Sequence, residues 1–416
     1  MDVRCRRARR RRSLDSGIHP GTIVRDAQKA WAPMTCATIE NLVIGGGPAG
    51  SMLALRLADA GRPVTLLEKE RTAHHKVCGE FLSREAVEYL DRAGISACAL
   101  GAVPIDRVRL SSGKNLVESP LPFRALSLSR HVLDEAMLHR AQDAGCSVRR
   151  GACVGELERD GDGWRAELRA GTTLRAQAVF LATGKHDLRG WARGCGVQSD
   201  LIGFKLHWRL RPAQTELLRG AMELFLFPGG YGGLAMVEGE VANLCLVVQR
   251  RRLQAEGGWT KLLEALRRGN RHLRARLEGG EPLWERPLAI SPIPYGYLAN
   301  GTGGLWRVGD QAAVIPSFTG DGMSIAMHSA ALAAQMYMEG RSMDECNRTL
   351  HAQLHTGMQI ATTLSRGLVT DLGRSLAPLA SAILPGGMRW IAAATRIPEG
   401  ALEGSRTWPE EYPVLG

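Results

Sequence analysis

The sequence predicts an α/β fold, in which a nucleotide-binding domain contains an inserted antiparallel β-sheet and is followed by C-terminal helices. Three observations support this class. A glycine-rich turn separates a short apolar run from a helix near residue 45, alternating polar and apolar residues dominate 203–248, and another apolar run ends in an acid near residue 310. Strand–helix–strand patterns form parallel sheets, whereas successive alternating runs form antiparallel ones.

The first glycine turn has the spacing G-x-G-x-x-G, with Gly45, Gly47 and Gly50. An expected helix over 51–60 follows, and the next apolar run ends in Glu68. In such a Rossmann-type unit the first glycine permits the tight turn, the second admits a pyrophosphate to the backbone N–H groups, and the third lets the helix pack on the strand. The acid accepts hydrogen bonds from ribose hydroxyls. The sequence therefore predicts dinucleotide binding, without distinguishing NAD from FAD.

The length of 416 residues suits two or three domains, and much of the net charge of +11 lies at the start of the chain. Residues 1–37 form an Arg-rich segment without apolar periodicity, so we expect a disordered tail. Met34 lies shortly before the first expected strand, which favours an over-long gene start or a dispensable tail over a functional basic arm. No apolar stretch follows the arginines, so no secretion signal is expected.

Nine cysteines are dispersed without a C-x-x-C pair, which indicates reduced thiols and a cytoplasmic location. The Cys and His residues show no metal-ligand spacing, so no metal site is expected. The uncharged stretch 375–388 contains two prolines and is too short to span a membrane, which leaves peripheral membrane contact open. The basic segment 257–277 is expected to be a solvated helix rather than a nucleic-acid-binding one.

The remaining pattern divides the chain into five regions. Alternating runs over 203–248 predict a sheet of three to five antiparallel strands, inserted into the nucleotide-binding domain. These strands carry apolar residues and scattered charges, which indicates a roof over a mostly apolar substrate pocket. The expected boundaries are 1–37 for the tail, 38–202 for the first part of the nucleotide-binding domain, 203–290 for the inserted substrate sheet, 291–345 for the second part and 346–416 for the C-terminal helical region.

Another glycine-rich turn follows an apolar run that ends in an acid. The run ends at Asp310, and Pro316 and Gly320 precede a long helix that begins around Gly322 and Met323. This arrangement resembles the second flavin-binding motif of the p-hydroxybenzoate-hydroxylase superfamily. The resemblance implies a Rossmann-type, GR2-like FAD-binding domain in which the acid binds the ribityl chain and the loop lies against the isoalloxazine. Backbone N–H groups and the helix dipole would there stabilise negative charge on reduced flavin.

Two further segments fit the same resemblance. Arg130, four residues before Asp134, matches the S-R-x-x-L-D segment of this superfamily, whose arginine lies near the cofactor. Residues Ala182, Thr183 and Gly184 resemble its middle motif, in which an Asp is commoner than a Thr. A nicotinamide or pyrophosphate role inferred from that Asp is therefore in doubt for this chain.

Three short segments are similar to one branch of the superfamily. They are Cys78-Gly79-Glu80, the Pro-Gly-Gly-Tyr-Gly run at 228–232, and the Gly-Asp-Gly-Met run at 320–323. All three resemble geranylgeranyl-reductase-like enzymes. The W-x-W-x-I-P signature of flavin halogenases is absent from the chain, so halogenation is not expected.

Together, the motifs and the resemblance predict one extended FAD site and no assigned catalytic residue, because a flavin carries the difficult step itself. Tyr231 and His328 are expected to be core residues. Cys78 is either a thiol over the flavin edge or a packed core residue, and Asp321 lies in a loop where it could reach solvent or substrate. The expected cofactor-binding residues are Gly45, Gly47, Pro48, Ala49, Gly50, Glu68, Lys69, Cys78, Gly79, Arg130, Ala182, Thr183, Gly184, Gly309, Asp310, Pro316, Gly320, Gly322 and Met323.

These expectations describe an FAD-dependent oxidoreductase that acts on a hydrophobic small molecule, such as a prenyl or polyketide-derived compound. The first hypothesis is monooxygenation, meaning hydroxylation or epoxidation, driven by NAD(P)H. The alternative is flavin-dependent reduction of a prenyl or polyketide-type double bond. A third hypothesis is an FAD-containing electron carrier that docks at a membrane through its C-terminal helices. Nucleic acid is not expected as a partner.

Overall fold

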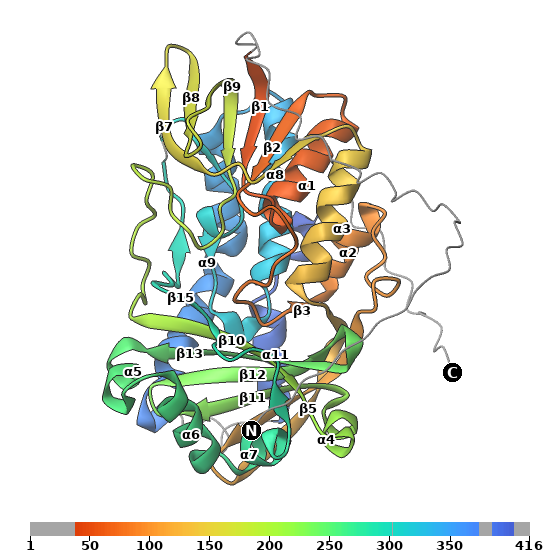
Figure 1. Ribbon diagram of the computed structural model, residues 1–416, viewed down its shortest axis with the longest axis vertical. Coiled ribbons are helices and arrows are strands. Elements are labelled where there is room, and N and C mark those ends of the chain that lie inside the picture. The colour runs from red at the N-terminus through yellow and green to blue at the C-terminus, as the bar shows by residue number, and fades with distance from the viewer. Residues whose placement is uncertain (1–37, 302, 374–384, 403–416) are drawn as a thin grey trace, which may run out of the picture. The chain divides into compact units, whose positions relative to one another are not determined.

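The computed structural model describes residues 38–301, 303–373 and 385–402. The predicted tail over 1–37 and most of the apolar stretch 375–388 lie outside these residues, so the expectations for both stay predictions. The helices of the described part include none that is long and apolar enough to cross a membrane. The described part has the predicted α/β class, with two large sheets and flanking helices (Figure 1).

The first layer is a seven-stranded sheet whose central strands run parallel. Its middle strand is the one before the first glycine turn, because residues 42–44 are apolar, buried and paired on both sides. In sheet order, the strands are β6 (Ser147–Arg150), β2 (Val64–Glu68), β1 (Ile39–Ile44), β9 (Thr173–Leu181), β8 (Gly163–Leu168) and β7 (Val154–Asp160), with β17 (Trp306–Arg307) paired to β9.

Helices α1 (Pro48–Asp59), α3 (Arg130–Asp143) and α8 (Gly322–Met338) pack beside this sheet, and α2 (Arg84–Arg92) packs on α8 (Figure 1). Small side chains let α1 and α8 approach closely, since Ala54, Ala330 and Ala334 are fully buried in their shared core. Because each helix begins at one of the two glycine turns, their contact brings both turns to the same place.

The second layer is a nine-stranded sheet, larger than the three to five strands expected. The alternating runs over 203–248 form its centre, but residues 103–127, which precede the predicted insertion, also join it through a parallel pairing of β11 with β4. In order, the strands are β14 (Glu281–Pro282), β10 (Leu201–Arg209), β13 (Val241–Gln249), β12 (Gly230–Val237), β11 (Gly220–Phe227), β4 (Val103–Ser112), β5 (Asn115–Ser127) and β3 (Phe81–Leu82), with β15 (Leu288–Ile290) paired to β10.

Four helices cover the outer face of this second sheet: α4 (Pro212–Leu218), α5 (Arg250–Glu256), α6 (Trp259–Gly269) and α7 (Arg271–Leu277) (Figure 1). The predicted helix over 257–277 is therefore two helices. The side chain of Asn270 explains the break, because it accepts hydrogen bonds from the backbone N–H groups of His272 and Leu273 and so caps α7.

The C-terminal part is helical where it is described. Helix α9 (Met343–Leu368) begins at a capping box in which Ser342 and Glu345 bond each other's backbone N–H groups, and α11 (Pro385–Ala394) follows later. The small sheet of β16 (Tyr297–Leu298) and β18 (Ala313–Val314) flanks Gly309 and Asp310 in sequence.

A buried carboxylate joins the two layers. Glu80 is fully buried with φ of 60°, and its carboxylate accepts hydrogen bonds from the backbone N–H of Arg130 at 2.8 Å, the ammonium of Lys205 and Nε2 of His207 at 3.0 Å. Burial raises the pKa of Glu80, but His207 and Lys205 together lower it by more than burial raises it. The pKa therefore lies below its usual range. The ionised carboxylate thus ties the start of α3 to strand β10.

We expect the substitution Lys205→Met to lower the free energy of unfolding by about 3–5 kcal/mol, because it leaves the buried Glu80 carboxylate without its main counter-charge. Urea unfolding followed by tryptophan fluorescence measures this loss. Lys261→Met, at an exposed position of α6, is the matched control and should change stability by no more than about 0.5 kcal/mol. Equal effects of the two substitutions would contradict the prediction.

Candidate functional site

A cavity of about 1180 Å³ lies between the two layers. The loops that follow the carboxyl ends of β1, β9 and β17 all line it, which is where open α/β sheets place their ligands. Of the cofactor-binding residues expected from the sequence, Gly50 and Pro316 do not line the cavity and the others do. The segment 74–81 and strands β10, β13 and β15 also contribute to its wall, as do residues 152–156 and 167–169.

The first glycine turn is shaped by close backbone contacts. Gly45 has φ of 111°, and a Cβ atom added to it would lie 2.4 Å from the carbonyl oxygen of Ala182. A Cβ atom added to Gly50 would lie 1.8 Å from the carbonyl oxygen of Gly45. Gly50 therefore packs α1 against the turn, and its absence from the cavity wall agrees with the packing role expected of the third glycine.

Glu68 lies at the end of β2, almost fully buried, beside the glycine turn. Its Oε2 accepts the backbone N–H of Gly46 at 2.8 Å, and its Oε1 accepts the backbone N–H of Glu70 at 2.9 Å. Each carboxylate oxygen has a second lone pair for a further donor. The position can therefore hold the hydroxyls of a ribose. Lys69 next to it is about half exposed and pairs with Glu70.

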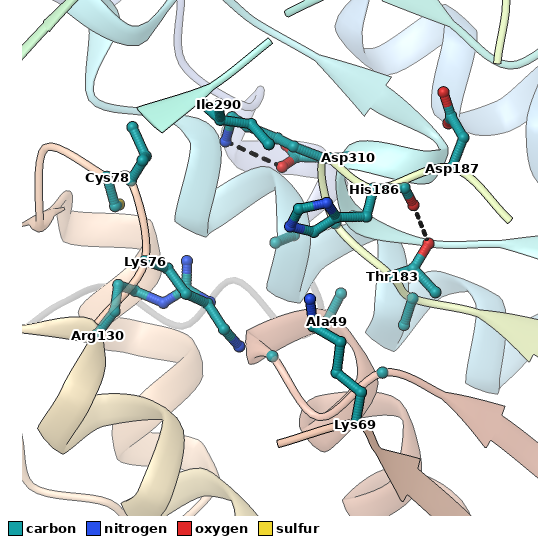
Figure 2. A pocket seen from close by; sticks show the side chains of 18 of the residues that line it. Ala49, Lys69, Lys76, Cys78, Arg130, Thr183, His186, Asp187, Ile290 and Asp310 are labelled. Carbon is teal, nitrogen blue, oxygen red and sulfur yellow. Dashed lines mark hydrogen bonds and ion pairs between the residues drawn. The ribbon is translucent and has the colours of Figure 1, made fainter. Parts of the chain in front are cut away.

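Two cations from different segments, Lys76 and Arg130, lie close to the second glycine of the turn. Figure 2 shows these two side chains next to each other. A Cβ atom on Gly47 would be 3.2 Å from Nη2 of Arg130 and 3.9 Å from Nζ of Lys76. Both cations contact the carboxylate of Asp134, at 2.6 Å and 2.9 Å. Burial raises the pKa of Asp134, but Arg130 and Lys76 lower it below its usual range. Two cations and one carboxylate leave a net positive charge where a pyrophosphate would lie.

The second glycine turn approaches the first. Gly309 has φ of 63°, and an added Cβ atom would lie 2.8 Å from the Cβ of Ala49 on α1. Asp310, labelled in Figure 2, accepts a hydrogen bond from Nζ of Lys185 at 3.1 Å. Its backbone oxygen accepts one from Arg193 at 3.0 Å. The Thr183 side chain donates to the backbone oxygen of His186 at 2.6 Å and closes the middle-motif turn. Thr183, which stands where the superfamily usually has Asp, thus stabilises this turn.

At its far end the cavity is lined by backbone that carries no side chain, at Gly79 and Gly322. A Cβ atom added to Gly79 or Gly322 would meet no other atom within 4 Å, and both residues line the cavity together with Cys78. A flat ring system can therefore lie against these two segments. The wall beyond them is mainly apolar and includes Gly203, Cys245, Leu246, Val247, Ile290, Ile293 and Val314.

The other candidate residues lie away from this wall. Tyr231 is buried with its hydroxyl 3.4 Å from Oγ of Ser365, which agrees with its expected core role. His328 is also a core residue, bonded to the hydroxyl of Tyr89 at 2.8 Å and to Gln353 at 2.8 Å. Asp321 is completely buried and does not line the cavity, so it reaches neither solvent nor substrate.

One group of described residues has the spacing of a cation site. The ligand atoms of His75, Glu80 and His207 lie within 4.8 Å of one another. Burial, together with the positive charge of Lys205 and then of His207, lowers the pKa of His75 to about 4. Because the Lys205 ammonium already neutralises Glu80, a metal ion would meet that positive charge at close range. The group therefore serves as an ion-paired junction between the layers.

Comparison with known proteins was consistent with this geometry. A protein-family model described as an FAD binding domain matches residues 38–186. Menaquinone reductase of Mycolicibacterium smegmatis is 27% identical over 332 residues, which cover 73% of this chain and 77% of that protein. Digeranylgeranylglycerophospholipid reductase of Methanocaldococcus jannaschii is 25% identical over 307 residues, covering 71% and 75% of the two chains. The chain belongs to the FAD-dependent oxidoreductases.

Solved structures share the fold of this oxidoreductase. The flavin-dependent brominase Bmp2 superposes with a TM-score of 0.71 at 17% identity and covers 88% of this chain and 96% of its own. The halogenase PltM in complex with phloroglucinol and FAD superposes with a TM-score of 0.67 at 14% identity, covering 86% and 85% of the two chains. At these identities the similarity shows the fold and carries no statement about the reaction.

The residues of the oxidoreductase cavity fit FAD along its length. Glu68 would hold the adenosine ribose, the first glycine turn with Arg130 and Lys76 would hold the pyrophosphate, and Asp310 would hold the ribityl chain. The bare backbone at Gly79 and Gly322 would hold the isoalloxazine, whose chemistry is hydride and electron transfer. The sequence reasoning missed Lys76 and Lys185, because neither stands in a motif and each contacts its partner only in the folded chain.

We expect Gly50→Ala to abolish FAD binding by the oxidoreductase, because the added Cβ atom would collide with the backbone of Gly45 at 1.8 Å. The visible flavin absorbance of the purified protein, relative to its protein absorbance, measures bound cofactor. Gly269→Ala is the matched control, since an added Cβ atom there meets nothing within 4 Å. A yellow Gly50→Ala protein with full flavin content would contradict the assignment of this turn.

We expect Lys76→Met to raise the dissociation constant for FAD by about 10- to 100-fold, because a hydrogen bond to a charged group contributes about 1.5–3 kcal/mol. Arg130 keeps its contacts with Asp134 in this variant, so the loop should stay in place. Titration of the apoprotein with FAD, followed by quenching of flavin fluorescence, gives the constant. Lys114→Met, on an exposed hairpin, should bind FAD as the unmodified protein does, and the same result for Lys76→Met would rule out the phosphate contact.

Proposed function

We propose that this oxidoreductase reduces an isolated carbon–carbon double bond in a hydrophobic, prenyl-type substrate. The observation that carries the proposal is the apolar far end of the cavity. There the bare backbone of Gly79 and Gly322 and apolar side chains such as Val247, Ile290 and Ile293 line one space. An isolated alkene offers no charge or strong hydrogen-bonding group, so a pocket must recognise it by shape and apolar contact.

The protein's own part in this reaction is to bind, orient and exclude water. Bound FAD would supply a hydride to one alkene carbon, and the other carbon would take a proton. The N-terminus of α8 at Gly322 and Met323 presents backbone N–H groups and the positive end of the helix dipole to the cavity, which suits the negative charge of reduced flavin.

The long similarities support reduction over oxygenation. The menaquinone reductase and the digeranylgeranylglycerophospholipid reductase match 73% and 71% of this chain, which is well beyond the FAD-binding segment at 38–186. We infer that the likeness to these enzymes includes part of the second sheet, which forms the apolar end of the cavity.

Monooxygenation, the first hypothesis from the sequence, becomes the second candidate. A 2-heptyl-3-hydroxy-4(1H)-quinolone synthase of Mycobacteroides abscessus is 32% identical over 153 residues, but these cover only 35% of this chain and 40% of that protein. A match of that length is about as long as the FAD-binding segment at 38–186. It supports a shared cofactor more strongly than a shared reaction.

We further propose NADPH or NADH as the electron donor. Lys69 and Arg189 both line the cavity with exposed side chains, where they pair with Glu70 at 3.7 Å and with Glu156 at 3.3 Å. A phosphate-bearing nucleotide would compete with these two exposed carboxylates for the cations. Anaerobic mixing of the holoprotein with either nucleotide tests this directly, because reduction bleaches the visible absorbance of the flavin. Bleaching by dithionite but by neither nucleotide would exclude this donor class and leave the reductase proposal in place.

The reaction itself is tested with chemically reduced holoprotein. Under anaerobic conditions we expect geranylgeraniol or menaquinone to gain one molecule of hydrogen across a prenyl double bond, seen as the corresponding mass increase of the product. The same mixtures prepared under ¹⁸O₂ should give no labelled product. Protein carrying Gly50→Ala, expected to lack FAD, is the control for adventitious reduction.

Label from ¹⁸O₂ in the product, with no anaerobic conversion, would replace the reductase proposal with the monooxygenase one. Anaerobic conversion without label would do the reverse. A holoprotein that converts neither compound in either atmosphere would overturn the prenyl substrate class.

A further inference from the structure

A buried ion group lies directly behind the start of α8. Asp321 is 0% exposed, its Oδ1 accepts a hydrogen bond from Nη1 of Arg396 at 2.6 Å, and its Oδ2 accepts one from the hydroxyl of Thr395 at 3.1 Å. Arg396 also donates to the backbone oxygen of Thr319 at 3.0 Å. The residue after Asp321 is Gly322, which lines the cavity. One arginine from the C-terminal segment therefore holds both ends of the loop that leads into α8.

The guanidinium of Arg396 is itself fixed from several sides. Its Nε donates to the backbone oxygen of Ala392 at 2.8 Å, and its carbon lies 4.4 Å from the centre of the Phe123 ring. Its Nη1 is 3.7 Å from Oε2 of Glu85, and the side chain is only 9% exposed. Contacts from α2, β5 and the end of α11 thus leave the guanidinium little freedom to move.

The charges in this group are unequal. The carboxylates of Asp321 and Glu85 share one guanidinium, so the group carries a net negative charge when both are ionised. Burial raises the pKa of Asp321 to about 7, with Arg396 opposing the rise and Glu85 adding to it. A negative charge at a helix N-terminus cancels part of the positive potential that the helix presents. Arg396 offsets that cancellation at the end of α8 that faces the cavity.

We propose that Arg396 is a positioning residue for the flavin: it fixes residues 319–321 and neutralises Asp321, and it thereby raises the reduction potential of FAD bound at Gly322 and Met323. The C-terminal segment is in this way part of the redox site, although none of its described residues lines the cavity. The proposal rests on the placement of FAD given above. It does not depend on which substrate is reduced or oxygenated.

The test is the midpoint potential of the holoprotein, measured against redox dyes over a range of pH. Removing Arg396 raises the pKa of Asp321 further, because Arg396 lowers it in the unmodified protein. At pH values above this higher pKa, Arg396→Gln should lower the ratio of the affinities for reduced and oxidised FAD at least tenfold, which is about 30 mV for a two-electron couple. Between the two pKa values the curves should converge, because there the carboxyl is protonated in Arg396→Gln and ionised beside Arg396 in the unmodified protein. Arg396→Lys should restore most of the potential.

Asp321→Asn provides the second, independent variant. It removes the negative charge and keeps the shape of the side chain. At alkaline pH the ratio of the affinities for reduced and oxidised FAD should therefore rise at least tenfold, and the midpoint potential should rise with it. The double variant with Arg396→Gln should then lie close to the unmodified protein. Arg84→Gln is the matched control, because the Arg84 and Glu399 pair at 3.4 Å joins the same two segments on the surface and does not involve Asp321.

A purely structural role for Arg396 would lower thermal stability and leave the potential unchanged at every pH, and that result would overturn the proposal. If Arg396→Gln does not fold, an unchanged potential in Asp321→Asn overturns it equally. An unmodified protein that binds no FAD would overturn both this inference and the proposed function. A holoprotein with the expected potentials that leaves double bonds intact would overturn the proposed function alone.

Discussion

The buried carboxylate of Glu80 is the interaction on which the arrangement of the site depends. It binds the backbone at the start of α3 and two side chains of β10 at once, and a carboxylate without such partners is costly to bury. Arg130, whose side chain lies over the glycine turn, is the residue whose N–H it accepts. The same ion group therefore sets the distance between the phosphate end of the cavity and the sheet that covers its apolar end.

The cavity changes in character along its length, and each part follows from a different physical cause. Near Glu68 the wall offers acceptors, since the carboxylate is held by backbone N–H groups and has lone pairs left. At the glycine turn, Arg130 and Lys76 outweigh Asp134 and leave positive charge. Beyond Gly322 the wall is mainly apolar, because Val247 of β13 and Ile290 of β15 line it. The neighbouring Leu246 belongs to the core behind the sheet.

The sequence was most informative where the interacting residues are consecutive. Gly45 to Gly50 and the start of α8 were predicted because a glycine turn between a strand and a helix is a local pattern. Contacts between distant residues left no such signal: Lys76 meets Asp134 across 58 residues, and Asp321 meets Arg396 across 75. For the same reason the hairpin over 103–127 was not expected in the second sheet, since its own alternation does not reveal its partner strand.

The two buried ion groups act on the cavity in different ways. Lys205 and His207 match the carboxylate of Glu80 with donors, so that group is neutralised and holds elements in place. At Asp321 one guanidinium serves two carboxylates, so that group carries a net negative charge when both are ionised. Because burial raises the pKa of Asp321 to about 7, this charge changes near neutral pH. The charge of such an ion group changes with small changes in pH or in a nearby charge, and its contribution to stability changes with it. Its place behind Gly322, where the reduced cofactor would add negative charge, makes an electrostatic role more consistent with the geometry than a purely structural one.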